Sequence, residues 1–220
     1  TLTPDGYCPS AAARLQHLLG CREIMAMDVN AACSGSLYGM QTARGLAAVC
    51  PGATVLMVAA ETLSSRTNWS DRSTCVLFGD GAGAVVLSAD PAARGAAIED
   101  IDLHCDGKFW ELLTVRGGGS ARPYKLGEPV AEDFFIQMAG RETFKQATRA
   151  MEAVSRDMLA KHGLAVADVD VFISHQANLR IISYVGKKLG FTEEQVFVNV
   201  DRYGNTSAAS AGIALAEVLP

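Results

Sequence analysis

The sequence predicts an α/β protein. Short apolar runs with strand character alternate along the chain with longer stretches of helical periodicity. The 220 residues are 49% hydrophobic and 20% charged, which is close to an ordinary globular protein and allows a substantial core. The longest mainly apolar run, 53–60, is far too short to span a bilayer, so we expect no membrane segment.

In the first half of the chain, strand-like runs surround one helix that is rich in small residues. This helix is predicted to end at Pro51-Gly52, because proline and glycine commonly follow the last residue of a helix. The predicted elements are, in order, a strand over 24–29, a helix over 33–48, a fully buried strand over 53–60, a strand region over 76–87 broken by the glycines of 79–83, and a half-exposed strand over 96–103.

In the second half, glycines mark the ends of two helices. The amphipathic pattern that begins at Phe144 is predicted to end near Gly163, and a second helix is predicted to end at Gly190. The predicted elements are a glycine- and proline-rich loop over 117–129, a helix that includes 144–159, a buried strand over 169–174, a helix over 179–189, a strand over 196–200 and a small-residue helix over 205–219.

Composition excludes several classes of protein. The net charge of −5 argues against a general nucleic-acid binder. The six cysteines form no C-x-x-C pair, so we expect no zinc or iron–sulfur site. Five of them lie among small or apolar neighbours, which favours a reduced thiol state and a cytoplasmic location.

Cys33 has a different setting, because it follows a predicted strand and opens a helix. The positive end of a helix favours a thiolate and a developing oxyanion, so Cys33 is a candidate nucleophile. A small residue packing a tight turn would fit the same position. His175 follows the predicted strand 169–174, where α/β proteins place ligand sites, and Asn205 lies in a strand-to-helix turn. Local backbone contacts for His175 and helix capping for Asn205 are the structural alternatives.

Two further features carry weaker signals. The glycines of 79–83 do not match a phosphate-binding loop and run into a strand, so they predict a close backbone approach. Between Asp170 and Glu193 every charged residue is basic, and two more basic residues lie on the preceding helix. This face would attract an acidic partner, although a solvated helix face is an equal alternative. The basic residues are Arg180, Lys187, Lys188, Lys145 and Arg149.

Taken together, these contexts resemble one family, the β-ketoacyl-acyl carrier protein synthases III among the thiolase-like condensing enzymes. The matching segments are 28–35 (DVNAACSG), 175–182 (HQANLRII), 204–210 (GNTSAAS) and 78–84 (FGDGAGA). The resemblance implies a layered αβαβα fold of two related halves, here 1–95 with the nucleophile and 96–220 with His175 and Asn205. A faint echo between 28–33 and 200–205, both leading from strand to helix, agrees with two halves.

The resemblance also implies a function. Cys33, His175 and Asn205 would catalyse condensation of an acyl-coenzyme A starter with malonyl-acyl carrier protein, which initiates fatty acid synthesis. Coenzyme A thioesters would be substrates, and no cofactor or metal is implied. Arg66, Gly140 and Asn178 match substrate-binding positions, and Lys145, Arg180, Lys187 and Lys188 match the surface that meets the carrier protein. A homodimer is implied, and a starter-condensing enzyme or acyltransferase of polyketide or secondary metabolism is the alternative.

The chain also departs from the family pattern. It lacks a first segment and the last strands with their glycine-rich loop, so we expect an incomplete thiolase-like fold in these 220 residues. Cys8 stands where the family often has a bulky aromatic residue, which suggests starters longer than acetyl. A papain-like hydrolase is a weaker alternative, because His175 lies 142 residues after Cys33 but the family's cysteine signature is missing. A non-catalytic paralogue is disfavoured, because all three candidate catalytic residues are present.

Overall fold

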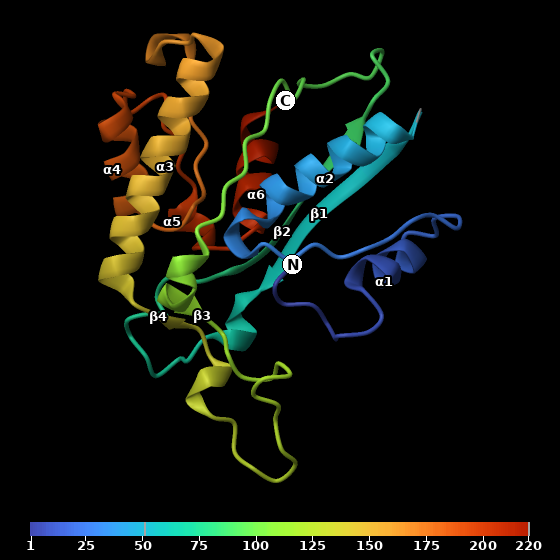
Figure 1. The fold of residues 1–220 in the computed structure, drawn as a ribbon, viewed down its shortest axis with the longest axis vertical. Coiled ribbons are helices and arrows are strands. Elements are labelled where there is room, and N and C mark those ends of the chain that lie inside the picture. Colours follow the sequence, from blue (N-terminus) through green and yellow to red (C-terminus); the bar gives the residue numbers. More distant parts are fainter. Residues whose placement is uncertain (51, 220) are drawn as a thin grey trace. The chain divides into compact units, whose positions relative to one another are not determined.

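The computed structural model describes residues 1–50 and 52–219 (Figure 1). The chain divides into two compact units, and each is described by itself. Unit 1 comprises Thr1–Glu61, Gly81–Ile101 and Thr206–Pro220, and unit 2 comprises Thr62–Asp80 and Asp102–Asn205. This division follows packing and interleaves along the sequence, so the halves 1–95 and 96–220 stay a prediction.

Unit 1 is built on two paired strands. Its elements are α1 (Ala11–Leu18), α2 (Gly35–Val49), β1 (Thr54–Thr62), β2 (Asp80–Ser88) and α6 (Ala209–Val218). Met57 of β1 packs with Met40 of α2, and Ala59 packs with Ala209 of α6. Side chains two residues apart on a strand point to the same side, so α2 and α6 both cover one face of β1. The predicted helix 33–48 and strand 53–60 are confirmed to within two residues.

Gly81 and Gly83 lie within a strand and do not break it, and Gly79 lies just before the first residue of that strand. The predicted strand region 76–87 is confirmed from Asp80 on, where β2 runs without interruption through Gly81 and Gly83 to Ser88. The prediction is wrong before that point, because residues 76–77 lie in a turn. A Cβ on Gly83 would lie 2.7 Å from both the Gly212 carbonyl carbon and the Ile213 nitrogen. The predicted close backbone approach is therefore confirmed, and the partner is helix α6.

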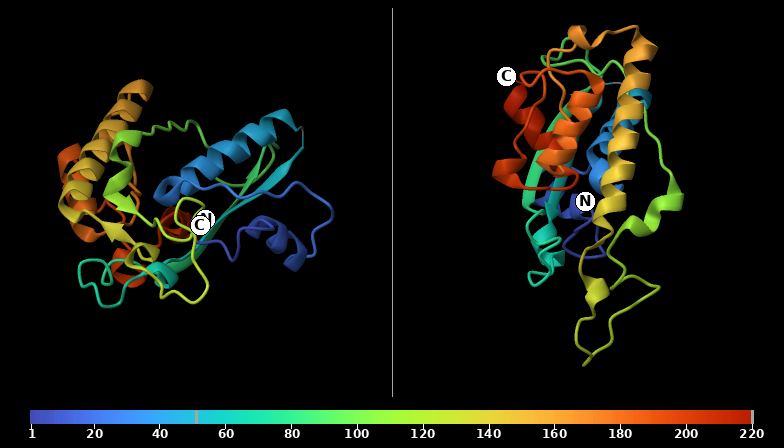
Figure 2. Two further views of the ribbon diagram at one scale, coloured as in Figure 1. Left: turned by 60° about the horizontal axis from the view of Figure 1, so that its bottom comes forward. Right: turned by 90° about the vertical axis from the view of Figure 1, so that its left-hand side faces the viewer.

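Unit 2 is dominated by two long helices packed side by side (Figures 1 and 2). Its elements are β3 (Leu113–Thr114), β4 (Gln137–Met138), α3 (Gly140–His162), α4 (Leu179–Leu189) and α5 (Val200–Tyr203). Phe144 and Met151 of α3 pack against a cluster that contains Val185 of α4. Both helices end at glycines in the left-handed region, Gly163 with φ 65° and Gly190 with φ 93°. Both predicted helices are confirmed, together with their ends.

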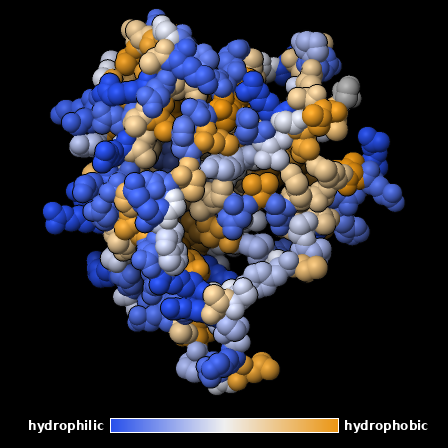
Figure 3. Space-filling model, in the orientation of Figure 1, coloured by the Kyte–Doolittle hydropathy of each residue, from blue (hydrophilic) through white to orange (hydrophobic). Residues whose placement is uncertain are grey.

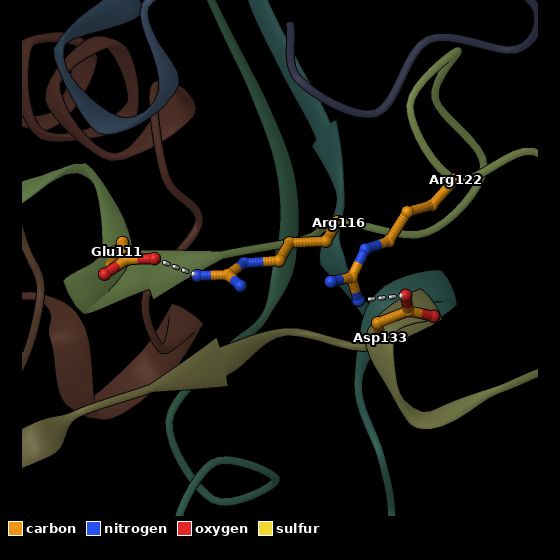
Figure 4. A network of polar contacts seen from close by, with 4 residues as sticks. All are labelled: Glu111, Arg116, Arg122 and Asp133. Carbon is orange, nitrogen blue, oxygen red and sulfur yellow. Dashed lines mark hydrogen bonds and ion pairs between the residues drawn. The ribbon is translucent and has the colours of Figure 1, made fainter.

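The glycine-rich segment between β3 and β4 is an irregular loop, as predicted, and ion pairs tie it down (Figure 4). Arg116 Nη2 lies 3.0 Å from Glu111 Oε1, and Arg122 Nη1 lies 3.0 Å from Asp133 Oδ2. The Gly117 N–H donates to the Asp133 carbonyl at 2.7 Å. A Cβ on Gly117 would lie 2.9 Å from the Phe134 backbone nitrogen, so a larger residue could be accommodated only if the backbone moved.

Four predicted strands are not strands in the part of the chain that is described. Residues 24–29, 96–103, 169–174 and 196–199 are irregular, apart from one parallel bridge between Phe172 and Val196, and Val200 is the first residue of helix α5. A strand needs a neighbour to accept and donate its backbone hydrogen bonds. These runs have strand-like composition, but the described chain pairs them with at most this one bridge.

Candidate active site

Cys33 lies at the entrance to helix α2, as the sequence indicates. It is half-buried in a 3-10 turn, Ala32–Ser34, that passes directly into α2. The residue before it, Ala32, has φ 45°, a conformation that costs energy in any residue except glycine. Such strain persists only where the surroundings impose it, and it accumulates at functional sites. The backbone thus presents Cys33 at the positive end of a 15-residue helix.

A second strained residue meets the cysteine. Ser207 has φ 49° and is 1% exposed, and its Oγ donates a hydrogen bond to Cys33 Sγ at 3.6 Å. Ser207 stands just before α6, so the starts of α2 and α6 meet here. Their contact is tight, since a Cβ on Gly35 would lie 3.1 Å from Ala208 Cβ.

His175 lies in unit 2 in a short turn that a buried glutamine fixes. Gln176 is 1% exposed, and its Nε2 donates to the carbonyls of Ser174 at 3.0 Å and Phe197 at 3.3 Å. Its Oε1 accepts from the Asn199 N–H at 2.9 Å. The turn that carries the half-buried His175 is therefore bound to the segment that leads toward Asn205.

Asn205 is held through its backbone. Its N–H donates to the Leu77 carbonyl at 2.8 Å, and its own carbonyl accepts from the Gly79 N–H at 3.0 Å. Gly204 before it has φ 66°, and a Cβ there would lie 3.1 Å from the Leu77 carbonyl oxygen. Both backbone groups of Asn205 are thus satisfied within unit 2, and the residue is 7% exposed, so the backbone position from which its side chain extends is fixed.

The three predicted substrate-binding residues have different surroundings. Asn178 caps α4, because its side chain accepts from the Ile181 N–H at 2.9 Å. It also lines a mostly apolar hollow of about 630 Å³ next to the His175 and Asn205 segments. Gly140 is the exposed first residue of α3. The guanidinium of Arg66 stacks 4.1 Å from the Phe134 ring centre, and its Nη1 lies 3.4 Å from the Tyr124 hydroxyl.

The predicted basic surface lies on α3 and α4 of unit 2. Lys145 is exposed on α3, 3.7 Å from Glu142, and the α3 side of the molecule is largely hydrophilic (Figure 3). Arg180 lies over the Phe144 ring at 5.8 Å, and Lys188 lies 5.7 Å from the Tyr184 ring centre. Lys187 and Lys188 occupy the last turn of α4, where the helix dipole favours positive charge.

The structure thus places the three candidate catalytic residues in two units, Cys33 in unit 1 and His175 with Asn205 in unit 2. Sequence reasoning did not assign a role to Ser207, although the residue lies inside a quoted motif. The only feature of the sequence that points to Ser207 is its position two residues after Asn205. A serine in the sequence does not by itself indicate a left-handed backbone conformation. Among residues 1–50 and 52–219, no His, Cys, Asp or Glu group is arranged to hold a metal, and no helix has the length and apolarity needed to cross a membrane.

Comparison with known proteins identifies the family. The family model for 3-oxoacyl-[acyl-carrier-protein] synthase III matches residues 27–107, and the model for its C-terminal part matches 159–220. The chain belongs to this family. A β-ketoacyl-[acyl-carrier-protein] synthase III from Oleidesulfovibrio alaskensis is 54% identical over 218 residues, which cover 99% of this chain and 66% of that protein. The same enzyme from Clostridium perfringens is 44% identical over 217 residues, again 99% of this chain and 66% of that protein.

Solved structures agree on the fold. The 3-oxoacyl-[acyl-carrier-protein] synthase III of Aquifex aeolicus matches with a TM-score of 0.84 at 42% identity, over 99% of this chain and 65% of that one. The Pseudomonas aeruginosa synthase III matches with a TM-score of 0.87 at 35% identity, over 98% of this chain and 64% of that one. The predicted thiolase-like α/β fold is confirmed, and the papain-like alternative is excluded. The chain spans just under two thirds of the length of these relatives.

Proposed function

We propose that the protein carrying this chain condenses an acyl-coenzyme A starter with malonyl-acyl carrier protein, the step that initiates fatty acid synthesis. The observation that carries the proposal is Cys33, a half-buried thiol at the start of α2 with a serine hydroxyl directed at its sulfur. The family membership and the 54% identical relative named for this activity support it.

In the first half-reaction Cys33 acts as the nucleophile. Its proton passes to the imidazole of His175, and the thiolate attacks the acyl-coenzyme A carbonyl. The bond from that carbonyl to the coenzyme A sulfur breaks, and coenzyme A leaves with the proton as the free thiol. The acyl group remains on Cys33 as a thioester. The positive end of α2 favours the thiolate and the oxyanion that develops during attack.

In the second half-reaction His175 and Asn205 act as hydrogen-bond donors. They bind the thioester carbonyl of malonyl-carrier protein and stabilise the enolate that forms as carbon dioxide leaves. The carbanion attacks the Cys33 thioester, a carbon–carbon bond forms, and the sulfur departs as thiolate. An amide suits Asn205's role, because a carboxylate at that position would repel the enolate.

The basic surface of α3 and α4 supports the choice of partner. Lys145, Arg180, Lys187 and Lys188 are exposed on a protein of net charge −5, so they would steer an acidic carrier protein to this face. Arg66, Gly140 and Asn178 are proposed to bind coenzyme A and the pantetheine arm, with no further cofactor. A homodimer and a cytoplasmic location complete the proposal.

Mass spectrometry of the protein tests the proposal. Incubation with acetyl- or isobutyryl-coenzyme A should add one acyl group to Cys33, and malonyl-acyl carrier protein should then remove it as a β-ketoacyl product. Cys33→Ala should take up no acyl group. Cys75→Ala is the matched control, because Cys75 is also half-buried, and it should load normally. An acyl group that stays on Cys33 in the presence of malonyl-carrier protein would contradict the proposal.

A second candidate is a priming enzyme of polyketide synthesis. A priming β-ketosynthase from the R1128 polyketide pathway matches with a TM-score of 0.80 at 32% identity, over 98% of this chain and 63% of that one. The higher identity to the fatty acid enzymes ranks it second. Cys8, exposed in unit 1, is proposed to permit starters longer than acetyl. Competition between acetyl- and octanoyl-coenzyme A for Cys33 tests this, and a strict acetyl preference would contradict it.

A further inference from the structure

We infer that Ser207 is a positioning residue that holds the Cys33 sulfur and stabilises it as a thiolate. The inference rests on the proposed function, in which Cys33 is the nucleophile. Ser207 Oγ is 3.6 Å from Cys33 Sγ and donates a hydrogen bond to it, across 174 residues of sequence. The serine is 1% exposed, so its geometry is set by the surrounding protein and water does not compete for it.

The backbone on both sides of this contact is strained in the same way. Ala32 has φ 45° and Ser207 has φ 49°, and these are the two residues other than glycine that the described chain holds at positive φ. One directly precedes the cysteine and the other contacts its sulfur. Backbone conformations of this kind are unfavourable, and a fold retains them where the geometry they create is needed.

The packing around the contact leaves little room for the two partners to separate. Gly35 at the start of α2 and Ala208 at the start of α6 are in close contact, since a Cβ on Gly35 would lie 3.1 Å from Ala208 Cβ. Farther along α6, the Gly212 backbone lies against Gly83 of β2. The start of α6 is therefore fixed against the start of α2, and the Ser207 hydroxyl is fixed on the sulfur.

The chemistry of the reaction uses such a donor twice. A hydrogen bond to a charged acceptor is stronger than one to a neutral acceptor, so Ser207 favours the thiolate over both the thiol and the thioester. In the first half-reaction this raises the fraction of reactive thiolate. In the second it stabilises the sulfur as the carbon–sulfur bond breaks and the electron pair moves onto it. The hydroxyl keeps its proton throughout.

Alkylation of Cys33 by iodoacetamide, followed by peptide mass spectrometry across a pH series, tests this role without needing substrates. Ser207→Ala should slow alkylation near pH 7 about threefold to tenfold, the net value of one hydrogen bond, and move the pH profile upward. Alanine has the same Cβ as serine, so it tolerates φ 49° equally. Ser207→Gly removes the hydroxyl and also relieves the backbone strain. Ser210→Ala, at the second residue of α6 and also buried, is the matched control and should alkylate at the unchanged rate.

The outcomes separate the hydroxyl from the backbone. Slower alkylation with a shifted pH profile in both Ser207→Ala and Ser207→Gly supports the inference, with Cys75 in the same sample as the internal reference. Unchanged alkylation in Ser207→Ala overturns it, because alanine keeps the Cβ and the backbone path and lacks only the hydroxyl. The proposed condensation would survive that result, since acyl loading of Cys33 is measured separately. Conversely, a protein that does not transfer acyl groups would still report the serine–thiolate contact by alkylation.

Discussion

Two helix contacts in this molecule are built in opposite ways. In unit 1, α6 lies against β2 through Gly83 and Gly212, backbone on backbone. In unit 2, α3 lies against α4 through large side chains such as Phe144, Met151 and Leu189. Glycine contacts have no side chain that can adjust, whereas a cluster of long side chains can repack with small shifts. The first kind of contact fixes a distance and the second mainly buries apolar surface.

The difference matches what each contact supports. The rigid contact in unit 1 fixes α6, and Ser207, two residues before the first residue of that helix, contacts the sulfur of Cys33. The adaptable contact in unit 2 supports a surface of exposed basic residues on α3 and α4, where long flexible side chains tolerate small movements. A site that holds a sulfur within hydrogen-bonding distance demands tighter control than a surface of exposed charged side chains.

The largest expected effect comes from Gly83→Ala, which adds one carbon to the rigid contact. The new Cβ would lie 2.7 Å from two backbone atoms of α6, so the helix must move. We expect a loss of about 3 kcal/mol in the free energy of unfolding, at the upper end for overpacking, measured by urea denaturation. Alkylation of Cys33 should slow as well, because Ser207 moves with α6.

Gly45→Ala is the matched control for that variant. Gly45 is exposed in the middle of α2, and a Cβ there would meet nothing within 4 Å. The substitution should stabilise the protein by roughly 0.5–1 kcal/mol, because alanine favours the helix. If Gly83→Ala unfolds at the same urea concentration as Gly45→Ala, the backbone contact between β2 and α6 does not contribute to the stability of unit 1.

Val185→Ala probes the adaptable contact and should have the next largest effect. Val185 is 0% exposed in α4, within the cluster that α3 covers. Losing two buried methyl groups and leaving a small cavity should lower the free energy of unfolding by about 2 kcal/mol. Val154→Ala, on the exposed side of α3 at 41% exposure, should change it by less than about 0.5 kcal/mol. Equal losses of unfolding free energy in Val185→Ala and Val154→Ala would show that α3 and α4 do not pack through the cluster that contains Val185.

The same contrast explains what the sequence could predict. Helices α3 and α4 were predictable to their last residues, because their apolar periodicity and terminal glycines are local signals. Cys33, His175 and Asn205 were candidates from their places at the ends of predicted elements, whereas the thiolase-like fold and the binding residues came from motif resemblance. The strands predicted at 169–174 and 196–200 were wrong, since strand formation depends on a distant partner. The contact between Ser207 and Cys33 was invisible for the same reason, because no local pattern links positions 174 residues apart.

Asn178 is expected to show a smaller effect that separates two roles. Asn178→Ala removes the acceptor for the Ile181 N–H at the start of α4 and should cost about 1 kcal/mol. Asn178→Asp keeps that acceptor, so stability should be unchanged. If the Asn178 amide also binds the pantetheine arm, Asn178→Asp should raise KM for malonyl-carrier protein. Its urea unfolding curve should match that of the unsubstituted protein. An unaltered KM in Asn178→Asp would leave the residue with its capping role alone.

The smallest expected effect lies at Asp71, in the turn that precedes Phe78 and β2. The Ser73 hydroxyl, then the Thr74 hydroxyl and the Ser73 N–H, donate to this carboxylate and lower its pKa below the usual 3.8. A carboxyl with a lowered pKa in the folded state stabilises the fold above its unfolded pKa, and this contribution is lost as pH falls through the folded pKa. Urea denaturation at pH 7 and at pH 3 should therefore show a slightly steeper loss of stability for the unchanged protein than for Asp71→Asn. Asparagine keeps an acceptor oxygen for the Ser73 N–H but has no charge to titrate. An identical pH dependence of stability in the two proteins would therefore mean that the charge of Asp71 does not stabilise the fold.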